Sequence, residues 1–198
     1  YRRQRHMCIR DSDNLNLNEF PKVGDKLSYL EETISSEKHP IPLGSILPYF
    51  HQGTIRIRQK KYKFNGTIAS DNPKDLELYA QYFLNSPYLW GGKSILGIDC
   101  SGFTQVVFSL CGFHLPRDAY QQEEIGETVQ LSHIKPYDLV FFVNDKNRIH
   151  HVGIAWGKNQ IIHASGQVRI DQLTNEGIIH SSNNKLTHRL HSIKRIIE

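Results

Sequence analysis

The pattern of apolar and polar residues predicts three helices in the middle of the chain, two of them from apolar spacing. Apolar side chains at helical intervals follow an Asp-Asn-Pro helix start and predict a helix over residues 73–84. The same spacing from Cys100 onward, stopped by Gly112, predicts a second helix. A short polar helix is expected around residues 120–122, closed by Gly126.

Short apolar runs bounded by turn residues predict strands in the last third of the chain. They cover residues 138–143, 149–156, 160–165 and 186–197. The second and third runs are joined by Gly157-Lys158-Asn159, a three-residue hairpin loop containing glycine. Helices followed by antiparallel strands indicate the α+β class.

The first seventy residues have a weaker pattern. Alternation over residues 44–68 predicts a small antiparallel β element with a hairpin turn at Gln59-Lys60, and a short helix is expected at residues 29–33. Residues 1–12 are basic and aperiodic, and we interpret them as a sequence scar or a disordered segment. We therefore expect three regions: a scar or disordered segment over residues 1–12, a β element or linker over residues 13–70, and a catalytic domain over residues 71–198.

Composition excludes only a few classes of protein. A chain of 198 residues can hold one domain of ordinary size and a small appendage. Three cysteines are too few and too irregularly spaced for a disulfide framework or a zinc cage, and no apolar run is long enough to span a membrane. There is no export signal and no initiator Met, so we expect a fragment and leave the compartment open between cytoplasm and cell envelope.

The formal charge of +4 fits an anionic cell-wall surface as well as nucleic acid. Basic and aromatic residues alternate over residues 56–63, a pattern that could bind nucleic acid. The solvated outer face of a hairpin explains the same pattern, and we prefer that interpretation.

Cys100 stands where the second predicted helix begins, after a glycine-rich loop and directly after Asp99, a good helix cap. The unpaired amides and the dipole of a helix start stabilise a thiolate, which is the nucleophilic form of cysteine. A buried structural cysteine is the alternative, and from this position alone the two are equally plausible.

A cysteine nucleophile needs a base, and the predicted hairpin selects two of the eleven histidines. A loop at residues 157–159 pairs Gly153 with His163 and makes His151 a diagonal neighbour of His163 on the same face, roughly 7–8 Å away at the backbone. Alternation turns His150 to the opposite face. Two ordinary sheet histidines, or a metal site with Cys100, are the alternatives at this point, the metal site being disfavoured by the ligand spacing.

The ordered blocks YLWGG, DCSG, LPRDAYQQ, YDLVFF, HHVGIA and IIHAS resemble the NlpC family of papain-like cysteine peptidases, which cut bacterial cell-wall peptides. The resemblance runs from about residue 72 to the C-terminus. It implies a papain-like fold, in which N-terminal helices pack on an antiparallel sheet.

The resemblance also implies roles for individual residues. Cys100 would be the nucleophile, His151 the base and His163 the group that orients the base. Tyr88 would stabilise the oxyanion together with the Cys100 amide. The remaining matches are residues beside the cleft: Asp99 and Ser101 as substrate contacts, and Arg117 without an assigned role.

The implied reaction is hydrolysis of murein peptides, most often between γ-D-glutamate and a diamino acid. The subgroup nearest this pattern carries SH3-like barrels before the catalytic domain, which restrict it to peptides with a free N-terminal L-alanine. Residues 44–68 resemble the tail of such a module, but too few strands are expected for a whole barrel, so we expect a partial SH3-like element.

We therefore expect a monomeric cysteine endopeptidase that acts on peptidoglycan-derived peptides, with no metal, no cofactor, no nucleic acid and no membrane span. An amidase or acyltransferase with the same thiol chemistry is one alternative. A cell-wall-binding module with a decayed site is another, although the presence of Cys100, His151 and His163 together argues against decay.

Overall fold

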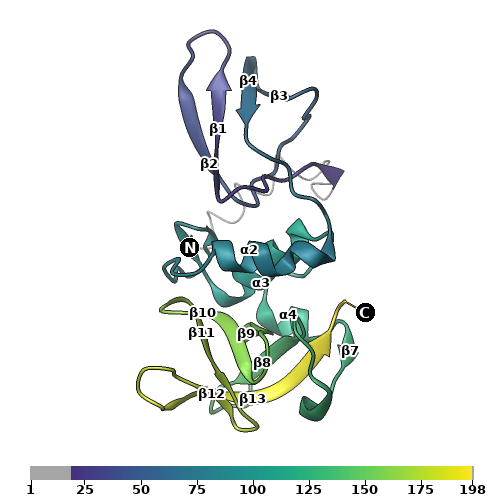
Figure 1. Cartoon of the computed structure of the whole chain (residues 1–198), viewed down its shortest axis with the longest axis vertical. Coiled ribbons are helices and arrows are strands. Elements are labelled where there is room, and N and C mark those ends of the chain that lie inside the picture. The colour runs from purple at the N-terminus through teal and green to yellow at the C-terminus, as the bar shows by residue number, and fades with distance from the viewer. Residues whose placement is uncertain (1–18, 198) are drawn as a thin grey trace. The chain divides into compact units, whose positions relative to one another are not determined.

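The structure, a computed structural model of the chain, describes residues 19–197 and divides into two compact units (Figure 1). One unit ends at Ala69 and the other begins at Ser70. The architecture is mixed α/β with mostly strands. The expectation for residues 1–12 lies outside the described residues.

The first unit contains a four-stranded antiparallel sheet in the order β2-β1-β4-β3. Its strands are β1 (Leu27–Glu32), β2 (Lys38–Pro42), β3 (Thr54–Ile57) and β4 (Lys60–Asn65). Its core is formed by the buried side chains of Val23, Leu30, Leu47, Ile55 and Phe64. The predicted hairpin is confirmed, with its turn one residue earlier than expected, because Ile57 pairs with Lys60.

The helix expected at residues 29–33 is wrong, because this segment belongs to strand β1. Its side chains alternate between buried and more exposed positions, with Ser28, Leu30 and Glu32 buried. Strands β2 and β4 pair with β1 on its two sides, and β4 is separated from β1 in sequence by two intervening strands. Non-local pairing has overridden the local pattern, and it adds two strands that the sequence did not predict.

The helices of the second unit confirm the three that the sequence predicts. They are the 3-10 turn η2 (Pro73–Asp75) with α2 (Leu76–Tyr82), then α3 (Cys100–Leu110) and α4 (Ala119–Glu123), with a further turn η3 (Leu131–His133). Asn72 caps the first by accepting the amide hydrogen of Lys74 at 3.0 Å. Gly112 ends α3 with a positive φ of 85°, a conformation that costs glycine little.

The sheet of the second unit is antiparallel, in the order β12-β11-β10-β9-β8-β13-β7. Its strands are β7 (Glu127–Thr128), β8 (Leu139–Val143), β9 (Ile149–Ala155), β10 (Gln160–Ser165), β11 (Gln167–Leu173), β12 (Gly177–Ile179) and β13 (Leu186–Arg195). A further pairing of β12 with β13 closes β8 to β13 into a ring. A small hairpin of β5 (Lys93–Ser94) and β6 (Gly97–Ile98) precedes α3.

Strand β8 is apolar throughout because both of its faces are buried. Val140 and Phe142 belong to the core inside the ring, together with Ile161 and Ile193. Helix α3 packs against β9 and β10. This packing brings the start of α3 close to the central strands, where the predicted histidines lie.

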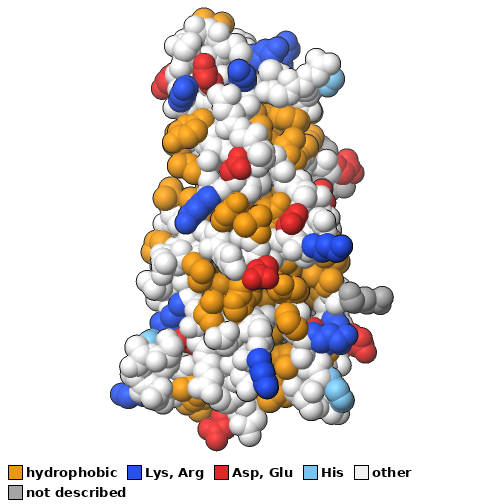
Figure 2. All heavy atoms as spheres, in the orientation of Figure 1, with side chains coloured by type: hydrophobic (Ala, Val, Ile, Leu, Met, Phe, Trp, Pro, Cys, Tyr) orange, Lys and Arg blue, Asp and Glu red, His pale blue; other side chains and the backbone are white. Residues whose placement is uncertain are grey.

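Acidic and basic side chains are interspersed on the face shown in Figure 2, so that face carries no field of one sign. None of the helices in residues 19–197 is long and apolar enough to cross a bilayer.

Candidate active site

Cys100 is the first residue of α3, as the sequence predicts, and its side chain is buried, with the residue 7% exposed. Asp99 caps the helix by accepting the Gly102 amide hydrogen at 2.7 Å. The backbone amide of Val152, the residue after His151, donates a hydrogen bond to the sulfur. The thiol therefore contacts the strand that carries the predicted base.

The expected stabilised thiolate is not found. Burial raises the pKa of the Cys100 thiol, and the nearby Asp99 charge adds to this, while amide hydrogens from Val152 and the helix start only partly offset the effect. Cys100 does lie at a helix start, but burial and the nearby Asp99 carboxylate raise the pKa of its thiol by more than the helix amides lower it. Cys100 rests as a thiol, so it needs a base to become a nucleophile.

His151 and His163 meet as the hairpin predicts. Gly153 pairs with His163 across β9 and β10, and His151 Nε2 lies 2.9 Å from His163 Nδ1. Both rings are buried. Burial lowers the pKa of each imidazole, that of His151 strongly, so both are neutral at pH 7.

Asp171, which the sequence analysis missed, extends this pair into a chain of three side chains. Its Oδ2 lies 3.0 Å from His163 Nε2, and it also accepts Arg169 Nε at 2.8 Å, while Oδ1 accepts the Ser181 amide at 2.9 Å. Burial opposes the charge of Asp171, but the hydrogen bonds from His163, Ser181 and Arg169 outweigh it and hold its pKa well below the usual range.

An ionised carboxylate can only accept, and this decides the positions of the protons. His163 Nε2 must donate to Asp171, so the neutral His163 ring presents a lone pair at Nδ1. His151 Nε2 must then donate to that lone pair. The basic atom left on His151 is Nδ1, and Asp171 selects it through two rings.

A second missed residue, His188 on β13, stacks on His151 with ring centroids 4.1 Å apart. His150 also stacks on His188, at 5.6 Å, so the expectation that it faces away is wrong. The cause is an irregularity in the β8–β9 register, where Phe142 pairs with His151 but the next pair is Val143 with Ile149. Such a bulge interrupts the alternation of side chains. We call His150, His151, His163 and His188 the histidine cluster.

Arg117, Asp99 and Ser101 form one hydrogen-bonded group at the start of α3. Arg117 donates to both carboxylate oxygens of Asp99, and its Nη1 also donates to Ser101 Oγ at 3.0 Å. Asp99 accepts two backbone amides as well, from Gly91 and Gly102. A ligand that bound the carboxylate of Asp99 would therefore have to share the two carboxylate oxygens with Arg117.

Tyr88 is partly buried just before the small hairpin, and its amide donates to the Gly166 carbonyl at 2.9 Å. Burial raises the pKa of its phenol, and the nearby Asp99 carboxylate adds to this. Its hydroxyl is therefore a neutral donor within electrostatic range of the thiol.

Five of the predicted residues thus fall into two hydrogen-bonded groups: the pair His151 and His163, and the group of Arg117, Asp99 and Ser101. Asp171 could have been found by the same counting that linked the two histidines. Arg169 pairs with His163 across β10 and β11, so Asp171 is the diagonal neighbour of His163 on the same face. His188 has no such signal, because its strand β13 reaches the neighbourhood of β9 by pairing with β8, which is far away in sequence.

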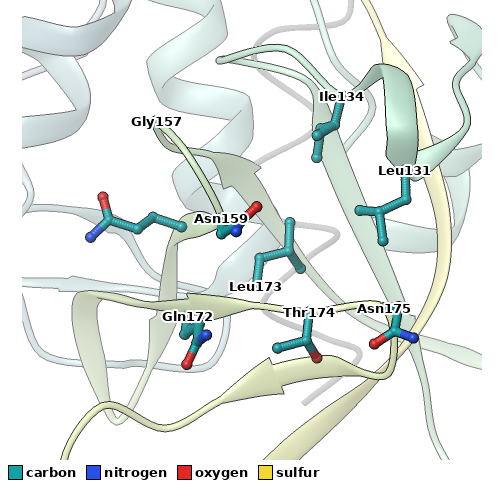
Figure 3. Close-up of a pocket in the computed structure, with 9 residues that line it drawn as sticks. Leu131, Ile134, Gly157, Asn159, Gln172, Leu173, Thr174 and Asn175 are labelled. Atoms are coloured by element: carbon teal, nitrogen blue, oxygen red, sulfur yellow. The ribbon is translucent and has the colours of Figure 1, made fainter.

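A surface pocket of about 260 Å³ lies elsewhere on the second unit (Figure 3). It is lined by Leu131, Ile134, Gly157, Asn159, Gln160, Gln172, Leu173, Thr174 and Asn175. None of the predicted site residues lines it, so it plays no part in the chemistry argued below.

Comparison with known proteins relates this site to a family. The profile of the NlpC/P60 family matches residues 85–187. A gamma-D-glutamyl-L-lysine dipeptidyl-peptidase from Bacillus cereus is 36% identical over 167 residues, covering 73% of this chain and 50% of the relative. The murein DD-endopeptidase MepS/murein LD-carboxypeptidase of Escherichia coli K12 is 42% identical over 99 residues, covering 50% of this chain and 48% of the relative.

A crystal structure of an NlpC/P60 family protein from Bacillus cereus aligns with a TM-score of 0.71 and 25% identity, covering 96% of this chain and 66% of that chain. The chain spans about half the length of these two curated relatives. Since the family profile matches more than half of its residues, including Cys100, His151 and His163, the chain belongs to the NlpC/P60 family.

Proposed function

We propose that the chain is a cysteine peptidase that hydrolyses peptidoglycan peptides at the bond between γ-D-glutamate and a diamino acid. The observation that carries the proposal is the chain from His151 through His163 to Asp171, beside a thiol that accepts the Val152 amide hydrogen. The names of the relatives, a gamma-D-glutamyl-L-lysine dipeptidyl-peptidase and a murein endopeptidase, support the substrate class.

The first half-reaction begins from a neutral thiol and a neutral imidazole. His151 Nδ1 takes the proton of Cys100 as the sulfur attacks the scissile carbonyl, which forms a C–S bond and an oxyanion. The tetrahedral intermediate collapses, the C–N bond breaks, and the His151 imidazolium gives its proton to the leaving amine. His163, oriented by Asp171, accepts from His151 Nε2 throughout and is a positioning residue.

The second half-reaction uses water. His151 takes a proton from a water molecule, whose oxygen attacks the thioester carbonyl, and the C–S bond breaks. The product carboxylate leaves, and the sulfur regains its proton from His151. In both halves Tyr88 and the Cys100 amide would donate to the oxyanion, and one such donor contributes about 3–4 kcal/mol in studied hydrolases.

Asp99, Ser101 and Arg117 would contact the substrate on the side of the helix start. The guanidinium of Arg117 neutralises Asp99, which lies next to the nucleophile and otherwise raises the pKa of the thiol. Arg117 therefore supports the chemistry by holding that carboxylate, and it keeps the group preorganised for a peptide.

We infer a papain-like arrangement for the second unit, from the helix-borne thiol packed against strands that bear the base. The four-stranded sheet of the first unit supports its assignment as an SH3-like element with more strands than the sequence predicted. We further propose a monomer that needs no resident metal or cofactor, and that works on murein fragments in the cytoplasm or on the wall in the envelope.

The test is digestion of L-Ala-γ-D-Glu-diamino-acid peptides, with products identified by mass spectrometry. Cys100→Ala and His151→Ala should each abolish cleavage. Cys111→Ala and His191→Ala are matched controls, because Cys111 is a buried cysteine whose pKa burial raises to about 12 and His191 is an exposed histidine of β13. Normal turnover by either of the first two variants would overturn the proposal, and cleavage at another bond would overturn the substrate assignment.

A further inference from the structure

The histidine cluster holds more imidazoles than the proposed reaction uses. One ring nitrogen from each of His151, His163 and His188 lies within 4.8 Å of the others. The peptidase chemistry needs His151 and His163, whereas His188 takes no part in it. His188 lies just outside the residues matched by the family profile.

The surroundings of these rings are those of a metal-binding histidine site. His163 Nε2 donates to the buried Asp171, and a carboxylate on the far nitrogen is the usual outer partner of a metal-bound histidine, since it turns the lone pair of the other nitrogen toward the metal. His188 Nδ1 lies 2.9 Å from the Thr187 hydroxyl, which leaves Nε2 of that ring unengaged. Imidazole nitrogens from three different strands, β9, β10 and β13, therefore lie close together.

We propose that His151, His163 and His188 form a binding site for a divalent zinc ion, and that zinc at this site switches off the base His151. Three imidazole nitrogens with a fourth open position are a familiar donor set for zinc. His150, exposed and stacked on His188, can supply the fourth ligand, or water can.

The geometry needs only a local adjustment. Zinc–nitrogen bonds of about 2.0–2.1 Å place tetrahedral ligands roughly 3.4 Å apart. His151 Nε2 and His163 Nδ1 are already 2.9 Å apart and have to separate slightly. His188 is only partly buried, so its ring can rotate out of the stack toward them.

The effect on the base follows from the proton balance. Zinc at His151 Nε2 replaces the proton that this atom donates to His163, and the neutral ring then carries its proton on Nδ1. A ring with zinc on Nε2 and a proton on Nδ1 cannot accept a proton from Cys100. The hydrogen bond to His163 that orients the ring is lost as well.

Zinc binding is measured directly, by competition with a chromophoric chelator, in a Cys8→Ala/Cys100→Ala background that removes two competing thiol ligands. We expect one zinc ion per chain, and cobalt in the same site should give the visible absorption of a tetrahedral ion without a thiolate band. Adding His188→Phe, which keeps an aromatic ring in the stack, should weaken the affinity by at least about tenfold. His191→Phe, on the same strand and exposed, is the matched control and should leave it unchanged.

Equal affinity with and without His188, or zinc binding that requires Cys100, would overturn the proposal, the second outcome indicating a cysteine–histidine site instead. The inhibitory part rests on the proposed function and is tested separately, as the ratio of peptide cleavage with and without zinc in the otherwise unaltered chain. In the His188→Phe variant, zinc should inhibit peptide cleavage less, so that this ratio should lie closer to one. Because binding is scored in an inactive background, its failure is distinguishable from a failure of the peptidase assignment.

Discussion

Asp171→Ala should lower kcat/KM by about 10- to 100-fold, although Asp171 touches neither the thiol nor the substrate in the proposed mechanism. The carboxylate holds the proton of His163 on Nε2 through a hydrogen bond of 3.0 Å. Without it, His163 can carry its proton on Nδ1 instead. His151 then has to present its own lone pair at Nε2 and its proton at Nδ1, which is the wrong arrangement for a base.

The magnitude follows from the strength of that bond. A hydrogen bond to a charged group stabilises its geometry by about 1.5–3 kcal/mol, and each 1.4 kcal/mol is tenfold in a population. Losing this hydrogen bond therefore reduces the population in which His163 carries its proton on Nε2, and His151 its lone pair on Nδ1, by roughly ten- to a hundredfold. The loss should fall on kcat, because the population of the basic form of His151 sets the rate of the chemical step in the proposed mechanism.

The assay is steady-state cleavage of the defined peptide, combined with a double-mutant cycle against His163→Ala. If Asp171 acts through His163, removing Asp171 should cost little once His163 is absent. Asp171→Asn is the variant to use if the alanine variant folds poorly. Asp138→Ala is the matched control, since Asp138 is also buried and bonded to an arginine, Arg195, at 2.9 and 2.8 Å.

The control should lose stability while keeping kcat. Two results would refute the reasoning: additive effects of Asp171→Ala and His163→Ala, or a loss of activity in Asp171→Ala that matches the Asp138→Ala control at equal loss of stability. Nitrogen NMR of His163 gives an independent check, because it reports which ring nitrogen carries the proton.

Three further predictions concern the same surroundings. Arg117→Met should destabilise the fold by about 3 kcal/mol in urea unfolding, because it leaves the buried Asp99 charge without its partner, and adding Asp99→Asn should restore part of the loss. Gly153→Ala should cost about 1–3 kcal/mol in thermal unfolding and reduce kcat, since a Cβ there would lie 2.9 Å from His163 Cβ; a fully stable, active variant would contradict the packing. Burial, then the neighbouring His163, lowers the pKa of His188 from 6.5 to about 4, so the unfolded chain binds more protons in this window and stability should fall as pH drops from 6.5 toward 4. The slope from this ring should be at most about 1.4 kcal/mol per pH unit, less for solvent screening, and His188→Phe should flatten it in urea unfolding at pH 7 and 4.5.

The features that the sequence predicted correctly are those whose cause is local. The helix start at Cys100 follows from its cap, its apolar spacing and its terminal glycine, all within thirteen residues of one another. The meeting of His151 and His163 follows from a three-residue loop, because a short loop determines the register of the two strands it joins. Both arguments use only residues that are close together in the sequence, within one helix or one hairpin.

The features that the sequence did not predict depend on neighbours that are distant in sequence. Strand β1 was expected to include a helix, and its pairing with β4, separated from it by two intervening strands, contributes to the different outcome. His150 was expected to face away, but a bulge against β8 turns it to His188. His188 itself reaches the base only because β13 pairs with β8 and β12 and closes the ring.

The sequence by itself therefore predicted the helix start at Cys100 and the meeting of His151 with His163, through a cap and a hairpin. The tertiary structure decided the state of that site. Burial and Asp99 keep the thiol protonated, Asp171 selects the basic nitrogen of His151, and His188 adds a third imidazole. The physical reason is that a pKa, a tautomer and a stacked ring depend on what surrounds a group in space, which strand pairing and burial set and local spacing does not.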